Sequence, residues 1–151
     1  MMKKCTACGV AIVERRREEH VVNFGGHRFT GQVIADVCPE CGDSLVTADE
    51  IARVELEAAR VLSDTGLVSG KSFRFMRHAL GLTARTVAAD FGVAHETISR
   101  WENEERPLDR LAWVTLAAMV HDRLEGHERT RVQLSATQKP AKLGRSVRLD
   151  T

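Results

Sequence analysis

Two short motifs of the same form, Cys-x-x-Cys-Gly, limit what this chain can fold into more than any other feature. One is CTACG at residues 5–9, the other is CPECG at residues 38–42, and the chain has four cysteines in all. Two cysteines separated by two residues bring both sulfurs to one side of a tight turn, and the glycine that follows can adopt a positive φ there. Four thiolates are a ligand set that Zn²⁺ prefers in structural sites. We therefore predict one structural zinc ion bound by Cys5, Cys8, Cys38 and Cys41.

The segment between the two motifs predicts a β-hairpin. Residues 10–24 (VAIVERRREEHVVNF) are strand-like at both ends, and residues 27–37 (HRFTGQVIADV) alternate between apolar and polar side chains. The pair Gly25-Gly26 between them is typical of a tight hairpin turn. A hairpin returns the second motif to the first, and the result resembles a zinc ribbon. A metal ion suits so small a module, because the module can bury little apolar surface.

Redox and catalytic roles are the alternatives for these cysteines. A thioredoxin-type motif needs one Cys-x-x-Cys at the start of a helix inside a βαβ unit, a pattern that this segment does not have. A catalytic zinc ion keeps an open coordination position, which four thiolates would fill. His20 and His27 lie on the predicted hairpin and are further candidate ligands, but we expect both to be surface residues. We therefore expect a structural metal and a protein that is not an enzyme.

Composition excludes a membrane protein. With 43% apolar residues, 28% charged residues and a net charge of +1, the 151-residue chain can form one ordinary domain or two small ones. No apolar run approaches the roughly 20 residues needed to span a bilayer, and no apolar segment follows the basic start as it does in a signal peptide. We expect a cytoplasmic location, where disulfides are rare and paired cysteines more often bind metal.

The segment after the second motif predicts one amphipathic helix. Thr47 and Glu50 have the spacing of a capping box at its start. The sequence Asp64-Thr65-Gly66 would end it, and the following GLVSG indicates a hinge. One helical face is apolar, and we expect it to pack within this chain, although a second copy could also cover it. The members of this face are Ile51, Val54, Ala58, Val61 and Leu62.

Residues 72–107 (SFRFMRHALGLTARTVAADFGVAHETISRWENEERP) predict a helix-turn-helix. We expect one helix over about 71–80, a second that follows Thr83 as N-cap, a third over about 95–102 and a fourth over about 108–124. Gly92 would lie in the turn between the second and third helices. The third helix would turn polar side chains toward base edges and phosphates. With the flanking arginines, the predicted DNA-binding residues are Arg85, His95, Glu96, Thr97, Ser99, Arg100 and Arg106.

These signals predict an α+β chain, in which a small zinc-ribbon β-hairpin module precedes an all-α helix-turn-helix domain. Net charge supports the division, because the connector is acidic whereas the last segment holds six basic and two acidic side chains. The predicted segments are a zinc-ribbon module at 1–47, a connector helix and hinge at 48–70, the helix-turn-helix domain at 71–125 and a basic, flexible tail at 126–151.

The stretch GLTARTVAADFGVAHETISRWEN (residues 81–103) resembles the Xre/Cro-type helix-turn-helix of bacterial and phage repressors. Joined to the two N-terminal cysteine motifs, the whole chain resembles the MqsA antitoxin family with its YgiT-type zinc finger. This resemblance implies a homodimer that binds a palindromic operator, usually in its own promoter. It also implies a zinc domain that binds a cognate toxin, often one that cleaves RNA.

Two residues depart from the family pattern. Glu96 stands where the best-known antitoxin of the family has a base-reading asparagine, and a carboxylate can only accept a hydrogen bond, for instance from cytosine. The operator sequence therefore does not follow from the resemblance. Glu104 stands where these motifs commonly have glycine, which leaves the form of the local turn open. Arg100 matches the pattern, and we expect it to contact a base.

The fourth predicted helix is more apolar than one face requires. We predict that part of it forms a two-fold dimer interface with Trp113 as an anchor. Three functions remain open from the residues alone. They are an autoregulating antitoxin, a phage or host transcription regulator without a toxin, and an adaptor whose zinc hairpin binds a protein. The basic tail is either a flexible arm, an additional phosphate contact or a segment that folds on a partner.

Overall fold

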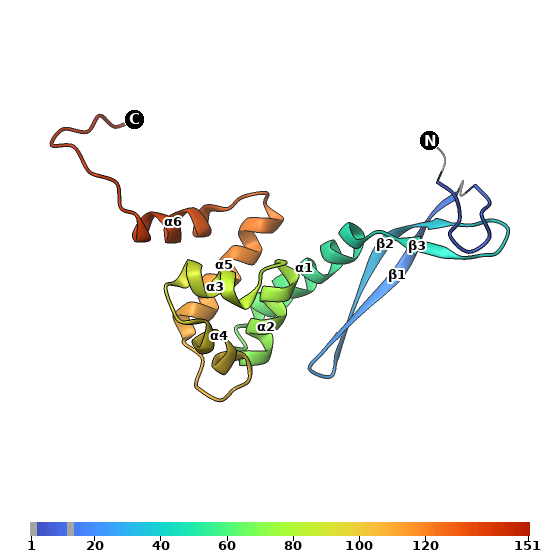
Figure 1. The fold of residues 1–151 in the computed structure, drawn as a ribbon, viewed down its shortest axis with the longest axis horizontal. Coiled ribbons are helices and arrows are strands. Elements are labelled where there is room, and N and C mark those ends of the chain that lie inside the picture. Colours follow the sequence, from blue (N-terminus) through green and yellow to red (C-terminus); the bar gives the residue numbers. More distant parts are fainter. Residues whose placement is uncertain (1–2, 12–13) are drawn as a thin grey trace. The chain divides into compact units, whose positions relative to one another are not determined.

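The computed structural model describes residues 3–11 and 14–151 and divides into two compact units (Figure 1). The first unit extends to Thr65 and the second begins at Gly66. The described residues form a three-stranded antiparallel sheet and six helices, which confirms the predicted α+β class. In this described part of the chain, no helix is both long enough and apolar enough to cross a membrane.

The sheet of the first unit is built on the predicted hairpin. Its strands, in the order β1-β2-β3, are Glu14–Phe24, His27–Val37 and Ser44–Val46. Gly25 and Gly26 have φ values of 57° and 80°, and Phe24 pairs with His27 across the turn. A two-residue loop with positive φ at both positions is a type I′ turn, the form that matches the twist of paired strands. The first strand was predicted over residues 10–24, of which 12–13 lie outside the described residues.

Helix α1 (Ala48–Thr65) continues the hydrogen bonding of β2 beyond the end of β3. The Glu50 carboxylate accepts the Ile34 N–H at 2.9 Å, and the Arg53 guanidinium donates to the Gln32 carbonyl at 2.7 Å. The Ile34 N–H and Arg53 together hold the pKa of Glu50 below its ordinary value. Two side chains of α1 thus satisfy backbone groups that a longer β3 would have paired.

Only half of the predicted capping box forms, because the Glu50 carboxylate is hydrogen-bonded to β2 instead. The Glu50 N–H donates to Thr47 Oγ1 at 3.4 Å, but the carboxylate does not return to the start of the helix. The predicted apolar face is confirmed at Val54 and Ala58, which are buried, whereas Val61 is 40% exposed. A Cβ on Gly31 would lie 2.7 Å from Val54 Cγ1, so the helix packs directly on the backbone of β2.

The second unit contains five helices along residues 66–151. Their bounds are α2 at Gly70–Ala79, α3 at Ala84–Phe91, α4 at His95–Glu102, α5 at Arg110–Leu124 and α6 at Arg129–Gln138. Phe73 of α2 is fully buried, and its ring meets those of Phe91 and Trp101 edge-on at centroid distances of 6.4 and 6.1 Å. This aromatic cluster ties both helices of the helix-turn-helix to α2.

Trp113 is a core residue of this unit. Its side chain is 3% exposed, and its Nε1–H donates to the buried Ser72 Oγ at 2.9 Å. The exposed apolar residues of α5 are Leu111 and Val114, at 67% and 51%. Trp113, predicted as an anchor of a dimer interface, instead holds α5 against α2, and Leu111 and Val114 are the large apolar side chains that α5 leaves exposed.

Four helices of the second unit end in the same way, with a residue of positive φ just after the helix. The residues in this position are Gly81, Gly92, Glu104 and Gly126. After α4, the Glu104 N–H donates to the Trp101 carbonyl at 3.2 Å and the Glu105 N–H to the Arg100 carbonyl at 2.9 Å, which is a Schellman motif. The turn keeps the geometry that glycine normally provides, and Glu104 adopts it with a φ of 58°.

Glu104→Gly is expected to stabilise the second unit by about 0.5–1 kcal/mol. Relief of the left-handed strain outweighs the greater entropy that glycine gives the unfolded chain. Urea unfolding followed by tryptophan fluorescence measures this, because both tryptophans of the chain, Trp101 and Trp113, lie in this unit. Glu105→Gly is the matched control and should give no gain. A lower urea midpoint for Glu104→Gly would contradict the explanation.

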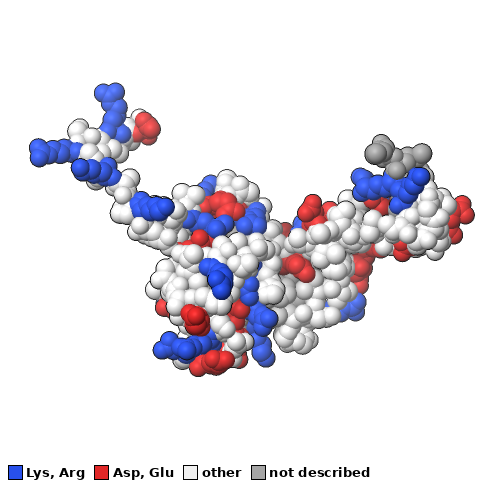
Figure 2. Space-filling model, viewed as in Figure 1, with Lys and Arg blue, Asp and Glu red and all other residues white. Residues whose placement is uncertain are grey.

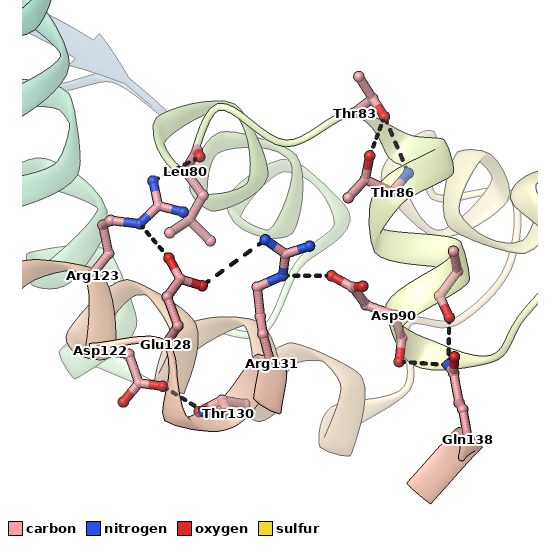
Figure 3. Close-up of polar contacts among 11 residues, drawn as sticks. Leu80, Thr83, Thr86, Asp90, Asp122, Arg123, Glu128, Thr130, Arg131 and Gln138 are labelled. Carbon is pink, nitrogen blue, oxygen red and sulfur yellow. Dashed lines mark hydrogen bonds and ion pairs between the residues drawn. The ribbon is translucent and has the colours of Figure 1, made fainter. Parts of the chain in front are cut away.

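Helix α6 lies in the segment for which the sequence predicted a flexible tail. A chain of ion pairs joins it to α5 and α3 (Figure 3). Arg123 contacts Glu128 at 3.1 Å, and Arg131 contacts Asp90 at 2.8 Å and Glu128 at 3.9 Å. None of the residues of α6 is fully buried, so these polar contacts contribute much of what holds the helix in place.

Candidate metal centre and nucleic-acid interface

The four cysteine sulfurs lie together at the base of the hairpin. All four Sγ atoms lie within 4.8 Å of one another. The closest pairs join the two motifs, with Cys5 Sγ 3.6 Å from Cys41 Sγ and Cys8 Sγ 3.5 Å from Cys38 Sγ. These distances exceed the S–S bond of about 2.05 Å in a disulfide. They are close to the ~3.8 Å between ligands that a tetrahedron with ~2.3 Å metal–sulfur bonds requires.

The two motifs have the same backbone conformation. In the first, the Cys5 N–H donates to the Val10 carbonyl at 2.6 Å and the Gly9 N–H donates to the Cys5 carbonyl at 2.9 Å. In the second, the equivalent hydrogen bonds measure 2.8 and 3.0 Å, and Gly42 has a φ of 74° against 77° for Gly9. Each glycine thus closes one turn in the left-handed region, as the sequence predicted.

The thiol chemistry of the cluster fits a divalent cation. N–H groups of Cys41 and Glu40 point at the Cys38 sulfur and lower its pKa to about 7. At Cys41 the Asp43 N–H favours the thiolate, but the adjacent Cys5 sulfur, burial and the other two sulfurs outweigh it and raise the pKa to about 12. Four thiolates at this distance repel one another, and a bound cation removes that repulsion. The donor set therefore suits a structural metal, with all four positions filled by sulfur.

Asp36 is a residue of this site that the sequence analysis missed. It is 8% exposed and forms ion pairs with Lys3 at 3.0 Å and Arg15 at 3.2 Å. The Lys3 ammonium, with Arg15 beside it, holds the pKa of Asp36 below its ordinary value. Lys3 comes just before Lys4, which forms a β-bridge with Ala11, so the two bridged residues lie on either side of the first cysteine motif. Asp36 thus fixes the chain entering the metal site, but an acidic residue on a strand gave no sequence signal for this role.

The histidines on the hairpin do not join the metal cluster. In the described part of the chain, the group of residues with metal-ligand spacing consists of the four cysteines. His20 pairs with Gly31 in the middle of the hairpin, and His27 lies beside the Gly25-Gly26 turn at the far end of the strands from Cys38.

The predicted helix-turn-helix is formed by α3, the turn at Gly92 and α4. Thr83 caps α3 by accepting the Thr86 N–H at 3.1 Å. Val87 and Ala88 on α3 and Ile98 on α4 are buried. Trp101 and Glu102 of α4 are also directed toward α2, so the side chains of α4 that remain exposed are His95, Glu96 and Arg100.

The seven residues predicted to bind DNA differ in how accessible they are. Thr97 and Ser99 are half-buried, and the Asn103 side chain donates to Ser99 Oγ at 3.4 Å. The exposed members are Arg85, His95, Glu96, Arg100 and Arg106. Among the residues that the structure describes, no ion pair engages the three arginines of this set, which leaves their guanidinium groups available to an anion.

Glu102, the last residue of α4, is buried rather than exposed. Its side chain is 7% exposed, and its carboxylate accepts two hydrogen bonds from Arg77 of α2. The Arg77 guanidinium also donates to the Leu82 carbonyl at 2.9 Å, at the start of the loop before α3. One buried arginine therefore joins α2, this loop and α4, and Glu102 contributes no charge to the exposed face.

Comparison with known protein families gives a match over most of the chain. Residues 2–126 match the family described as the antitoxin component of bacterial toxin-antitoxin system, MqsA. No curated protein and no solved structure gives a significant match. The matched residues include both cysteine motifs, the hairpin and the helix-turn-helix, and they end at Gly126, before α6. The chain therefore belongs to the MqsA antitoxin family.

Proposed function

We propose that this protein is a DNA-binding antitoxin that represses its own promoter. Membership of the MqsA family supports the antitoxin role. The observation that carries the DNA-binding part is the exposed polar face of α4, with its flanking arginines free of ion pairs among the described residues. In this proposal Arg100 reads a base, Thr97 and Ser99 contact base or phosphate, and the protein has no enzymatic activity.

The N-terminus of α3 is proposed as a phosphate site beside the major groove. The Thr83 cap leaves backbone N–H groups of the first turn directed outward, and the exposed Arg85 lies in that turn. Helix N-termini favour anions because unpaired N–H groups and the helix dipole act together. Arg106, after α4, is proposed to contact a phosphate on the other side of the reading helix.

The first unit, which contains the cysteine cluster, is proposed to bind the cognate toxin. The cluster of four sulfurs supports a structural role for Zn²⁺, which would hold the two cysteine motifs together while the hairpin and α1 present a surface. Ile34 and Leu45, on adjacent strands, are 47% and 43% exposed, and such side chains are suited to a protein partner.

A homodimer is proposed from the second unit, with Leu111 and Val114 of α5 at the two-fold axis. A two-fold protein would read two half-sites about one helical turn of DNA apart. The experiment that tests the function is footprinting of the zinc-loaded protein on the DNA upstream of its own gene. Protection of such a palindrome supports the autorepressor. Diffuse binding that salt abolishes would favour a protein-interaction adaptor instead.

Arg100→Ala is expected to weaken binding to the protected site by about 1–3 kcal/mol and to relax base preference at one position. Arg106→Ala should instead lower affinity for specific and unrelated DNA by a similar factor, because phosphates carry no sequence information. Titration of both DNAs at one salt concentration separates the two effects. Arg60→Ala, on α1 outside the helix-turn-helix, is the control and should leave affinity unchanged. Full operator affinity in Arg100→Ala would remove Arg100 from the reading role.

A further inference from the structure

The last thirteen residues, 139–151, carry basic side chains in a regular pattern. They are Lys139, Lys142, Arg145 and Arg148, each three residues from the next. All four are exposed, and no ion pair engages any of them in this fully described segment. Figure 2 shows basic side chains spread along the C-terminal segment. Pro140 favours an extended conformation of polyproline type, which has three residues per turn. A spacing of three then places all four charges on one side of the segment.

Helix α6 fixes the point where this segment leaves the folded unit. The Gln138 side-chain amide donates to the carbonyls of Ala89 and Asp90 at 2.6 and 3.2 Å, at the C-terminal end of α3 (Figure 3). At the other end of α6, the Thr130 N–H donates to the Asp122 carboxylate at 2.7 Å and holds the pKa of that carboxyl below its ordinary value. The basic segment therefore begins beside the helix-turn-helix, close to the turn that leads into α4.

The helix-turn-helix domain has little net charge of its own with which to attract DNA. Residues 71–125 hold eight basic and eight acidic side chains. Contacts between basic residues and phosphates supply most of the affinity that does not depend on sequence. Thirteen residues in an extended conformation reach about 40 Å at ~3.1 Å per residue. That length exceeds the 34–36 Å of one DNA helical turn, so the segment can reach phosphates beyond the bases that α4 would contact.

We propose that residues 139–151 form a DNA-binding arm whose four basic side chains bind backbone phosphates beside the site read by α4. The inference rests on the proposed function, because it assumes that the second unit binds DNA. A basic segment could also bind an acidic protein surface. Its attachment beside α3 favours DNA, since the arm and the reading helix then act on the same ligand. The arm lies beyond residues 2–126, so it is a property of this chain rather than of the matched family region.

The test compares three full-length proteins across a range of salt concentrations. One is wild type, one has K139Q, K142Q, R145Q and R148Q together, and one has Leu143→Ala, Val147→Ala and Leu149→Ala. The third is the matched control, because these three apolar side chains are exposed in the same segment, at 83%, 55% and 73%. Each is titrated with the footprinted DNA and with unrelated DNA of equal length. The glutamine variant should make the negative slope of log K against log salt shallower by about 3–4. Its affinity for both DNAs should fall by a similar factor.

The following results would contradict the proposed DNA-binding arm or separate it from the proposed operator function. An unchanged salt slope in the glutamine variant would show that its charges do not meet phosphates. Weaker binding in the alanine variant alone would point to an apolar contact with a protein or a second copy. A wild type that binds unrelated DNA without any preferred site contradicts the proposed operator function but still tests the arm on that DNA. A wild type that binds no DNA at all contradicts both.

Discussion

Removal of the metal is expected to unfold the first unit while the second unit stays folded. The described part of the first unit offers a three-stranded sheet and one helix, and the sulfur cluster joins its two cysteine motifs. Structural zinc contributes about 10–16 kcal/mol of apparent binding free energy in small zinc domains, which exceeds what so small a core can supply. A strong chelator should therefore abolish the strand signal in far-UV circular dichroism. Tryptophan fluorescence should not change, because Trp101 and Trp113 both lie in the second unit.

Cys38→Ser should have the same effect as the chelator and should lower the bound metal below one ion per chain. Cys38 is buried, so the variant leaves a weak ligand at a position that water cannot readily fill. His27→Ser is the matched control, since His27 lies at the opposite end of β2 and should keep full metal content. Visible absorption of Co²⁺ in place of zinc reports a tetrahedral thiolate site directly. One firmly bound ion in Cys38→Ser, with the sheet intact, would show that the metal is not held by four sulfurs.

Acidification of the wild-type protein should also release the metal. The ligands bind as thiolates, so protons compete with the cation and the affinity falls as the pH falls. The neighbouring carboxylates act in the same direction. Asp36 and Glu50 have lowered pKa values in the folded unit, so their contribution is present above their unfolded pKa and is lost as the pH falls through the folded values. The first unit should therefore unfold on acidification before the second.

Features set by short stretches of sequence were predicted well. The Gly25-Gly26 turn, the Thr83 cap and the bounds of α4 each depend on a few adjacent residues, and each is present in the structure. The cluster of four cysteines was also predictable, because two local motifs need only a hairpin to meet. The exposed face of α4 followed from helical periodicity once the apolar positions were assigned to the core.

Features set by contacts between distant residues were not predicted. Helix α6 has no apolar face and no side-chain cap, so its helical state depends on ion pairs with Asp90 and Arg123 that the local sequence does not reveal. Glu50 has the spacing of a capping residue but is recruited by β2. Trp113 was predicted as an anchor of a dimer interface because nothing nearby in the sequence indicated that Ser72 would accept its N–H.

Breaking the ion pair between Arg77 and Glu102 is expected to cause the largest loss of stability in the second unit. Both side chains are nearly buried, with exposures of 10% and 7%, and the second of their two hydrogen bonds measures 2.9 Å. Breaking a buried pair by neutralising one partner typically costs about 3–5 kcal/mol, because the remaining charge is left buried without a counter-ion. Glu102→Gln is therefore expected to lose that much free energy of unfolding, measured by urea unfolding with tryptophan fluorescence.

The pair is expected to matter for position as well as for stability. Arg77 contacts α4 through Glu102 and the loop before α3 through the Leu82 carbonyl, so its loss loosens both helices of the helix-turn-helix relative to α2. At temperatures where Glu102→Gln is still folded, we expect weaker binding to the proposed operator with an unchanged salt slope, because no phosphate contact is removed. A reduced salt slope would instead mean that Glu102 or Arg77 acts at the DNA surface.

Two further variants separate the buried charge from the packing around it. Glu105→Gln removes an exposed carboxylate from the turn after α4 and should change stability by less than about 0.5 kcal/mol. The double variant Arg77→Met with Glu102→Leu replaces the pair by apolar side chains and should recover most of the stability that Glu102→Gln loses, as buried ion pairs often tolerate apolar replacement. If the double variant is as unstable as the single one, the hydrogen bonds to the loop and α4 are themselves essential, and desolvated charge is not the cause. If Glu102→Gln costs no more than Glu105→Gln, the pair is open to water in solution and does not join α2 to α4.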